Sequence, residues 1–231
     1  MLLGMWRMTD KDSTDTNTAC INMIKQQCRT WDVLNPVILN LLQSVPREDF
    51  VPAHFRHLAF ADTALSLGHN QTMLVPKEEA KILDKLNIKN SERVYEIGTG
   101  SGYFTALLAK QAKHVDSIEF FEDFVKTAAQ KLHAHNIYNV ECEKGDGLVH
   151  KNKWVEYDVI VITGSLKVLP KHFLSKLNLG GRLFAFLGEA PLVKAVLFTK
   201  VSDINTTTEI LFETQVNPLI TTQHKNEKFV F

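Results

Sequence analysis

The sequence is poor in cysteine, which argues against a zinc-binding protein. Its 231 residues contain three cysteines, Cys20, Cys28 and Cys142, and no C-x-x-C pair. An odd count without such a pair is typical of a reducing cytoplasm. His54 and His57 have a spacing seen in metal ligands, but no Cys, Asp or Glu cluster accompanies them. We therefore predict no metal site.

The sequence also lacks an excess of either charge. Lysine and arginine total 26, as do aspartate and glutamate, so the formal net charge is zero. No global basic field is present to attract nucleic acid or an anionic membrane, and we expect neither as a partner. No apolar run is long enough to span a bilayer, and the apolar start lacks the basic leader and cleavage site of a signal peptide. We therefore expect a cytoplasmic protein.

A phosphate-binding loop, G-x-x-x-x-G-K-[ST], is absent, yet glycines gather in one segment, V-Y-E-I-G-T-G-S-G-Y at 94–103. This segment reads as a buried strand that runs through a tight turn into a helix. Glycine allows a positive φ and a close approach to a ligand, and the start of a helix presents free N–H groups. The segment therefore predicts a cofactor loop, although a strand–helix turn without a ligand has the same pattern.

The spacing of the glycines narrows the choice of cofactor. A dinucleotide fingerprint needs G-x-G-x-x-G, and here Gly98 and Gly100 fit the first two positions while Tyr103 occupies the last. An NAD oxidoreductase is therefore disfavoured. The pattern E-x-G-x-G-x-G instead resembles the loop with which class I methyltransferases bind S-adenosylmethionine (AdoMet).

Three later segments supply the other strand ends of such a site. Glu119 ends the strand over 114–119, about 20 residues after the first glycine, where an acidic residue binds ribose hydroxyls. A third strand ends in the turn Gly145-Asp146-Gly147, and in methyltransferases such an acidic residue faces the adenine amino group. The apolar run 157–164, which contains Thr163, suits a buried parallel strand.

The alternation of strands and helices from Val94 onward predicts an α/β fold. We expect a Rossmann-like class I methyltransferase: a doubly wound, mostly parallel sheet with helices on both faces, including one over 169–177. Strands over 194–200 and 207–212 should form an antiparallel hairpin at the C-terminal edge.

We expect four parts along the chain. These are a flexible leader over 1–17, a helical extension with a substrate-side segment over 18–76, an AdoMet-binding domain over 77–223 and a tail over 224–231.

Several segments together resemble one family. V-P-R-E-D-F-V-P at 45–52 resembles the motif VPRExFVP, and G-H-N-Q-T at 68–72 resembles GHGQT. E-I-G-T-G-S-G-Y-F-T-A at 96–106 resembles EIGTGSGYxTA, and V-N-P-L at 216–219 also has a counterpart. Over roughly 20–220 the chain resembles the protein-L-isoaspartate O-methyltransferases, so that a carboxylate of damaged protein is the implied substrate.

The chain departs from the family at its active-site hydroxyl. The family motif continues GQTISxP and its serine is regarded as the active-site residue, whereas Leu74 stands there in this chain and Asn70 replaces a glycine. This variant resembles a divergent bacterial branch. If 72–74 is extended, Thr72 and Leu74 share a face, and Thr72 is our candidate catalytic hydroxyl. Leu74 itself reads as a plain wall residue.

The resemblance implies two sets of site residues. On the substrate side they are His69, Gln71, Thr72 and Leu74. The expected AdoMet-binding residues are Glu96, Gly98, Thr99, Gly100, Ser101, Gly102, Tyr103, Glu119, Asp146, Gly147 and Thr163.

The expected chemistry is transfer of a methyl group to an oxygen. A carboxylate is already ionised at neutral pH, so positioning can suffice, whereas a hydroxyl or amine needs a base. The sequence has no obvious His–Asp pair beside the loop, which favours a carboxylate. Two alternatives stay open: the same chemistry on another protein or small-molecule acceptor, and an AdoMet-binding protein without isoaspartyl activity. The oligomeric state is not predicted.

Overall fold

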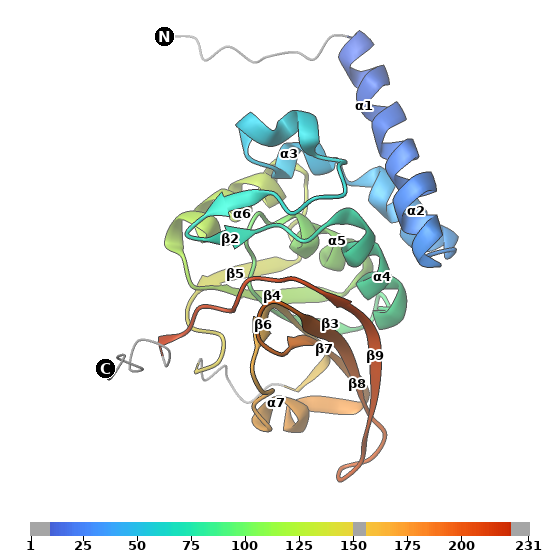
Figure 1. Cartoon of the computed structure of the whole chain (residues 1–231). Coiled ribbons are helices and arrows are strands. Elements are labelled where there is room, and N and C mark those ends of the chain that lie inside the picture. The colour runs from blue at the N-terminus through green and yellow to red at the C-terminus, as the bar shows by residue number, and fades with distance from the viewer. Residues whose placement is uncertain (1–9, 150–155, 223–231) are drawn as a thin grey trace.

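The structure is a computed structural model that describes residues 10–149 and 156–222. Its centre is a seven-stranded sheet in the order β5-β4-β3-β6-β7-β8-β9 (Figure 1). The first five strands in this order run parallel to their neighbours, while β8 and β9 pair antiparallel at the edge. The strands are β3 (Arg93–Ile97), β4 (His114–Glu119), β5 (Val140–Lys144), β6 (Tyr157–Leu166), β7 (Leu177–Leu187), β8 (Val193–Lys200) and β9 (Thr206–Thr214).

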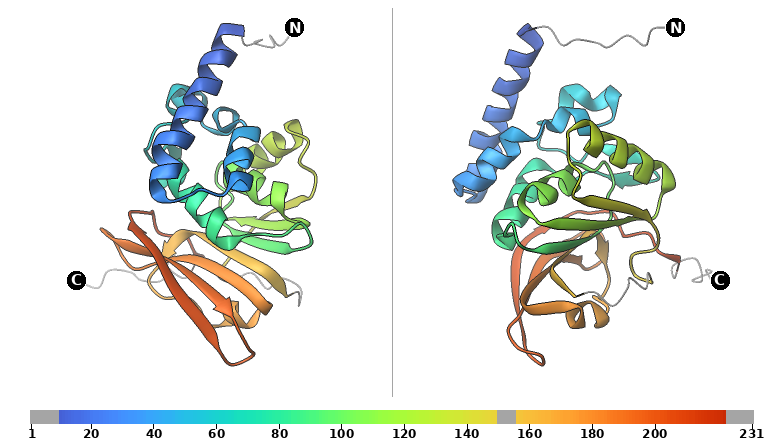
Figure 2. Two further views of the ribbon diagram at one scale, coloured as in Figure 1. Left: turned by 90° about the vertical axis from the view of Figure 1, so that its right-hand side faces the viewer. Right: turned by 180° about the vertical axis from the view of Figure 1, so that it is seen from behind.

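The long helices of the α/β unit gather on one face of the sheet. These are α4 (Pro76–Leu86), α5 (Tyr103–Gln111) and α6 (Glu122–Ala134), whereas the other face carries the short α7 (His172–Ser175) (Figure 2). Alternate strand residues serve the two faces: Val94 packs in the cluster with α4 and α5, and Tyr95 packs in the cluster with Phe173 of α7. The predicted α/β architecture with a mostly parallel sheet is confirmed, with unequal helical cover on its two faces.

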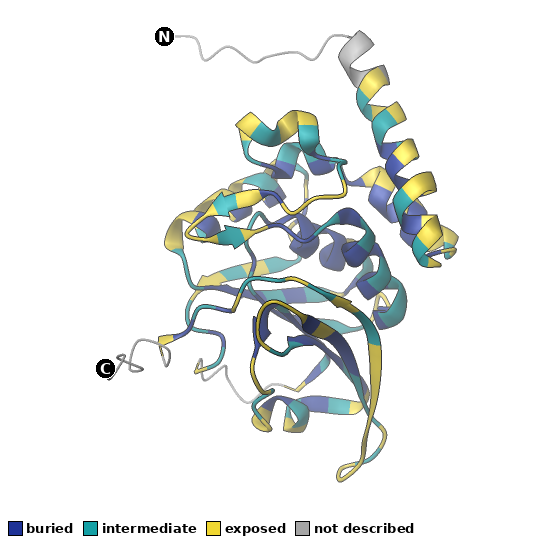
Figure 3. Cartoon of the chain, in the orientation of Figure 1, coloured by how far each residue is buried: buried dark blue, intermediate teal, exposed yellow. Residues whose placement is uncertain are grey.

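Helix α4 joins the N-terminal extension to the sheet and has clear boundaries. Pro76 occupies its first turn, where the missing N–H costs no hydrogen bond. Asn87 ends it in the left-handed conformation, with φ +46°, and its N–H donates to the Leu83 carbonyl. Its apolar side is fully buried, including Ile82 and Leu86 (Figure 3). The helix therefore forms a fixed support beside the glycine loop.

The N-terminal extension is helical and begins earlier than predicted. Helix α1 starts at Asp10, inside the segment expected to be a flexible leader. The elements are α1 (Asp10–Met23), η1 (Ile24–Cys28), η2 (Arg29–Trp31), α2 (Pro36–Ser44), α3 (Arg47–Phe50) and η3 (Ala53–Leu58).

The helix expected over 169–177 is much shorter. Only His172–Ser175 is helical, and β7 already begins at Leu177. The strand carries an irregularity at Gly180-Gly181, where Gly180 has φ +77° and the register against β6 shifts. The sequence expectation took these glycines for a turn before the strand, whereas they lie within it.

Two expected segments, the first residues of the leader and the tail over 224–231, lie outside the described residues. Within the part of the chain that is described, no helix is both long and apolar enough to cross a membrane.

Candidate active site

A pocket opens where the parallel strands end at the glycine loop. One wall comes from that loop and from the ends of β4 and β6, and the facing wall comes from the hairpin of β1 (Ser66–Gly68) and β2 (Gln71–Thr72). Ten of the predicted site residues line it: Gly98, Thr99, Gly100, Ser101, Glu119, Gly147, Thr163, Gln71, Thr72 and Leu74. The topology therefore brings the two predicted halves of the site together.

The glycine loop has a conformation that requires glycine. Gly98, Gly100 and Gly102 have φ values of +99°, +52° and +82°. A Cβ atom on Gly98 would lie 2.2 Å from Oγ1 of Thr163, a hydroxyl that donates to the carbonyls of Ile97 at 3.0 Å and Gly98 at 2.8 Å. The loop thus passes close to β6 and turns directly into α5.

Glu119 links the loop to β4. Its Oε2 accepts a hydrogen bond of 2.8 Å from the Gly100 N–H, and its Oε1 accepts one of 3.0 Å from the Phe121 N–H. Burial raises the pKa of this carboxyl, while the backbone N–H groups oppose that change. Each oxygen keeps lone-pair capacity, and the side chain faces the pocket. Glu119 can therefore both shape the loop and accept hydrogen bonds from a bound hydroxyl.

Glu96 lies beneath the loop and does not line the pocket. It is fully buried, and its Oε2 accepts hydrogen bonds from Thr105 at 2.5 Å and Ser117 at 2.6 Å. The Ser117 hydroxyl lies 2.6 Å from that of Thr99 in the loop. Among the described atoms, Oε1 of Glu96 has no hydrogen-bond partner. Burial raises the pKa of Glu96 to about 8. Because its hydrogen bonds lead to the loop and its side chain does not reach the pocket, Glu96 supports the loop and is not a direct ligand.

Tyr103 and Asp146, which we expected to bind the cofactor, also lie outside the pocket lining. Tyr103 is buried under the Arg47 guanidinium, 4.7 Å from its ring centroid, and so faces the N-terminal extension. Oδ2 of Asp146 accepts hydrogen bonds from the Thr222 N–H at 2.7 Å and from the hydroxyls of Thr221 and Thr222. Burial pushes the pKa of Asp146 up, but these hydrogen bonds outweigh it and hold the pKa below its usual value.

His69 stands at the rim of the site. Its backbone is left-handed, with φ +51°, and its ring stacks on Phe121, a pocket residue, at 4.1 Å between centroids. Its Nε2 lies 3.0 Å from Oδ2 of Asp123, and this hydrogen bond lowers the pKa of Asp123. The structure thus contains a His–Asp pair that the sequence did not reveal, because 54 residues separate its members.

Sequence reasoning also missed much of the pocket wall. Four phenylalanines, Glu79 and a C-terminal stretch contribute: Phe104, Phe120, Phe121, Phe124, Glu79, Val216, Asn217, Leu219 and Ile220. The residues directly after Glu119 could have been found as its neighbours at the strand end.

We call 216–222 the closing segment, because it joins the two sides of the site. Asn217 donates from Nδ2 to the carbonyl of Asn70, in the turn between β1 and β2, at 2.8 Å. Thr221 donates to Asp146, in the turn after β5.

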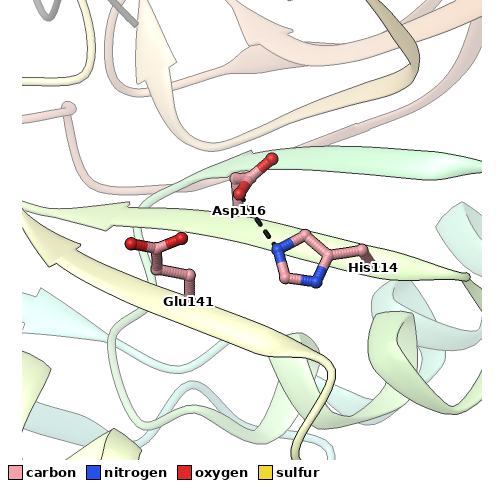
Figure 4. Close-up of side chains that lie close together, drawn as sticks. All are labelled: His114, Asp116 and Glu141. Carbon is pink, nitrogen blue, oxygen red and sulfur yellow. Dashed lines mark hydrogen bonds and ion pairs between the residues drawn. The ribbon is translucent and has the colours of Figure 1, made fainter. Parts of the chain in front are cut away.

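One further cluster of side chains lies on β4 and β5, where Figure 4 shows His114, Asp116 and Glu141. Their ligand atoms lie within 4.8 Å of one another, and His114 Nε2 is 3.1 Å from Asp116 Oδ1. Arg93 donates to the other oxygen of Asp116 at 3.0 Å, so a cation already pairs with this carboxylate. None of these residues lines the pocket described above.

The parallel sheet, the glycine loop and the acidic end of β4 together define a Rossmann-like class I methyltransferase. The family model for protein-L-isoaspartate(D-aspartate) O-methyltransferase (PCMT) matches residues 17–224. The chain belongs to this family, whose members are AdoMet-dependent methyltransferases that act on carboxyl groups.

Individual relatives agree with the family match. The chain is 35% identical to protein-L-isoaspartate O-methyltransferase 1 of Rhodopseudomonas palustris, over 90% of this chain and 86% of the relative. It is 37% identical to the Syntrophus aciditrophicus enzyme, over 80% and 85%.

A Plasmodium falciparum structure, described as a PCMT in complex with S-adenosyl-L-homocysteine, superposes with a TM-score of 0.76 at 20% identity. It covers 89% of this chain and 98% of that one, which supports the fold.

Proposed function

We propose that this chain transfers the methyl group of AdoMet to the carboxylate of an isoaspartyl residue in damaged protein, as a repair enzyme. The observation that carries the proposal is the pocket itself, in which the glycine loop faces the segment 71–74. Cofactor chemistry lies on one wall and acceptor-side residues lie on the other, so a methyl donor and an acceptor can meet between them.

The residues present fit AdoMet. The three left-handed glycines leave room for close approach, and α5 begins directly behind them, so that the positive end of the helix adjoins the loop. Glu119 offers carboxylate oxygens to ribose hydroxyls, and Phe120 and Phe121 offer apolar surface beside it. Bound AdoMet supplies an activated methyl group. We assign Gly98, Gly100, Ser101 and Glu119 to its binding, and Glu96 and Asp146 to the support of the pocket.

The protein's own contribution to the reaction is positioning. A carboxylate has a reference pKa of about 4 and needs no base at neutral pH. We call the pocket-lining segment 71–74 the acceptor wall. Gln71 and Thr72 are its polar side chains, and we assign Thr72 the role of orienting the acceptor. Leu74 cannot donate a hydrogen bond, so orientation rests on fewer contacts than in relatives with a serine. Bringing the reactants together correctly is itself a large part of such catalysis.

One observation favours a second candidate. The His69–Asp123 pair stands at the rim, where a histidine could accept a proton from a hydroxyl or amine acceptor. Together with Leu74, it supports methyl transfer to a different protein or small-molecule acceptor. The family relationship favours the isoaspartyl substrate.

Three free cysteines support a reducing compartment, and we propose the cytoplasm as the site of action. Cys20 and Cys28 are buried within the extension, and burial raises their pKa values to about 11 and about 12. Such thiols are unreactive and pack as small apolar groups.

The test combines binding and turnover. Calorimetry with AdoMet measures cofactor affinity, and transfer of a labelled methyl group is followed into an isoaspartyl peptide, its aspartyl counterpart and a cell extract. Base-labile label in the isoaspartyl peptide alone supports the proposal. Label that enters the extract but never the peptide, with AdoMet bound, supports the second candidate instead.

A further inference from the structure

The side chain of Arg47 lies buried behind the acceptor wall. It opens α3 and is 1% exposed. Its Nη2 donates to the Leu74 carbonyl at 2.7 Å, its Nε donates to the Ala59 carbonyl at 2.8 Å, and its Nη1 pairs with the Glu79 carboxylate. One guanidinium thereby holds three segments of the extension and α4 together. The contact with Leu74 is made to the backbone, so it does not depend on which side chain stands there.

Arg47 also touches the cofactor side. Its guanidinium lies 4.7 Å from the ring centroid of Tyr103, the first residue of α5, directly after the glycine loop. Glu79, its carboxylate partner, itself lines the pocket. The same side chain therefore contacts the segment directly after β2, which carries the acceptor wall, and the helix that supports the cofactor loop.

The chemistry of this contact set favours arginine over lysine. The planar guanidinium donates in several fixed directions at once and stacks on an aromatic ring, whereas an ammonium is a point charge. A lysine at this position could reach the Glu79 carboxylate but could not also satisfy two carbonyls and the Tyr103 ring. The Arg47 guanidinium and the Glu79 carboxyl are each other's buried partners, so removal of either one alone leaves a buried polar group without its partner.

We propose that Arg47 is a positioning residue for methyl transfer, which fixes the backbone of 72–74 at a set distance from the AdoMet loop. The proposal rests on the proposed function for the identity of the acceptor, but not for the geometry of the wall. Its loss should displace the acceptor relative to the methyl group while the glycine loop still binds AdoMet. The residue thus acts through Leu74 and Thr72 and does not touch the reactants.

The test compares Arg47→Lys with Arg182→Lys. Arg182 is a matched control, because it also bridges carbonyls and a carboxylate, at the far end of α4: it donates to the Leu86 carbonyl and pairs with Glu92. It does not line the pocket. Both variants should lose stability. Only Arg47→Lys should lower kcat, by about 10–100-fold as expected for a lost hydrogen bond from a charged group, with the Kd for AdoMet within about twofold.

A second readout needs no turnover. The Met73 N–H donates to the Leu65 carbonyl within the acceptor wall, and the Ala106 N–H donates to the Gly102 carbonyl at the start of α5. With S-adenosylhomocysteine bound, hydrogen exchange at Met73 should accelerate about tenfold in Arg47→Lys and not at Ala106. If the wild type fails to methylate isoaspartyl peptide, the proposed function falls while this measurement still tests Arg47.

A double variant keeps the proposal testable even if Arg47→Lys does not fold. Arg47→Met with Glu79→Leu replaces both members of the buried pair with apolar side chains, an exchange that is often tolerated. It should fold and bind AdoMet, yet show the same fall in kcat and the same exchange at Met73. An unchanged kcat in the double variant, or equal losses of kcat, AdoMet affinity and Ala106 protection in Arg47→Lys, would overturn the proposal.

Discussion

At the scale of single residues, Leu74 is the position at which the substrate-side segment departs from the family motif, whereas the glycine loop matches it. Its side chain is buried in the pocket wall, whereas the neighbouring Thr72 is exposed. The backbone at Leu74 is held by Arg47, so the side chain can change without moving the chain. This position is therefore suited to substitutions that alter turnover and leave the fold intact.

We predict that Leu74→Ser raises kcat on an isoaspartyl peptide by about tenfold or more. The new hydroxyl can donate to the acceptor carboxylate, and a hydrogen bond to a charged group contributes about 1.5–3 kcal/mol. Leu74→Ala is the control, since it opens the same space without a donor. Steady-state methyl transfer measures both variants, and equal rates in the two would show that space rather than the hydroxyl matters.

Glu96 is a second residue with a distinct consequence. Its pKa is raised from 4.5 to about 8 by burial, so the folded state retains a proton that the unfolded chain loses between these pH values. Its contribution to stability is thus complete below pH 4.5 and is lost as the pH rises through about 8.

We predict that Glu96→Gln flattens this dependence. Urea unfolding from pH 5 to pH 8 should show a slope smaller by up to about 1.4 kcal/mol per pH unit, the limit for one proton. Ser117 and Thr105 can still donate to the amide oxygen, so the fold is kept. A variant whose slope equals that of the wild type would mean that Glu96 is ionised when buried.

At the scale of elements, the glycine loop depends on its left-handed residues and on the closeness of β6. We predict that Gly98→Ala weakens AdoMet binding by about 5–150-fold, because strain of roughly 1–3 kcal/mol falls on the loop and the new Cβ meets Thr163. Gly180→Ala is the control: its φ is +77°, but a Cβ there meets no atom within 4 Å. Calorimetry should show normal affinity for the control.

The elements near the glycine loop were the most predictable part of the chain. Local patterns reported the strand before Gly98 and the strand end at Glu119, and both residues line the pocket. Sequence patterns do not predict side-chain direction, which is why Glu96 and Tyr103 do not line the pocket as expected. The side chain of Asp146 is held by Thr221, which is 75 residues away and could not be paired with it from the sequence. The His69–Asp123 pair escaped notice for the same reason, since only the folded chain brings the two together.

At the scale of the whole molecule, the pocket is lined by residues that are far apart in the chain, from Leu67 to Ile220. A ligand that binds only the folded state stabilises it, by about 2.7 kcal/mol at 100 times its Kd. For a chain of this size we predict a rise in Tm of about 5–11 °C with S-adenosylhomocysteine. NAD at the same concentration should leave Tm unchanged. Differential scanning calorimetry measures both, and a shift with NAD alone would contradict the assigned cofactor.

The closing segment also affects the order in which the protein folds and gains its cofactor. It follows β9 in chain order, yet it forms a wall of the pocket and joins Asn70 to Asp146. A folding intermediate that has formed its sheet and its glycine loop therefore still lacks one side of the pocket until this segment docks. Capture of the cofactor then depends on that docking, and a partly folded chain would not compete with the folded protein for the methyl donor.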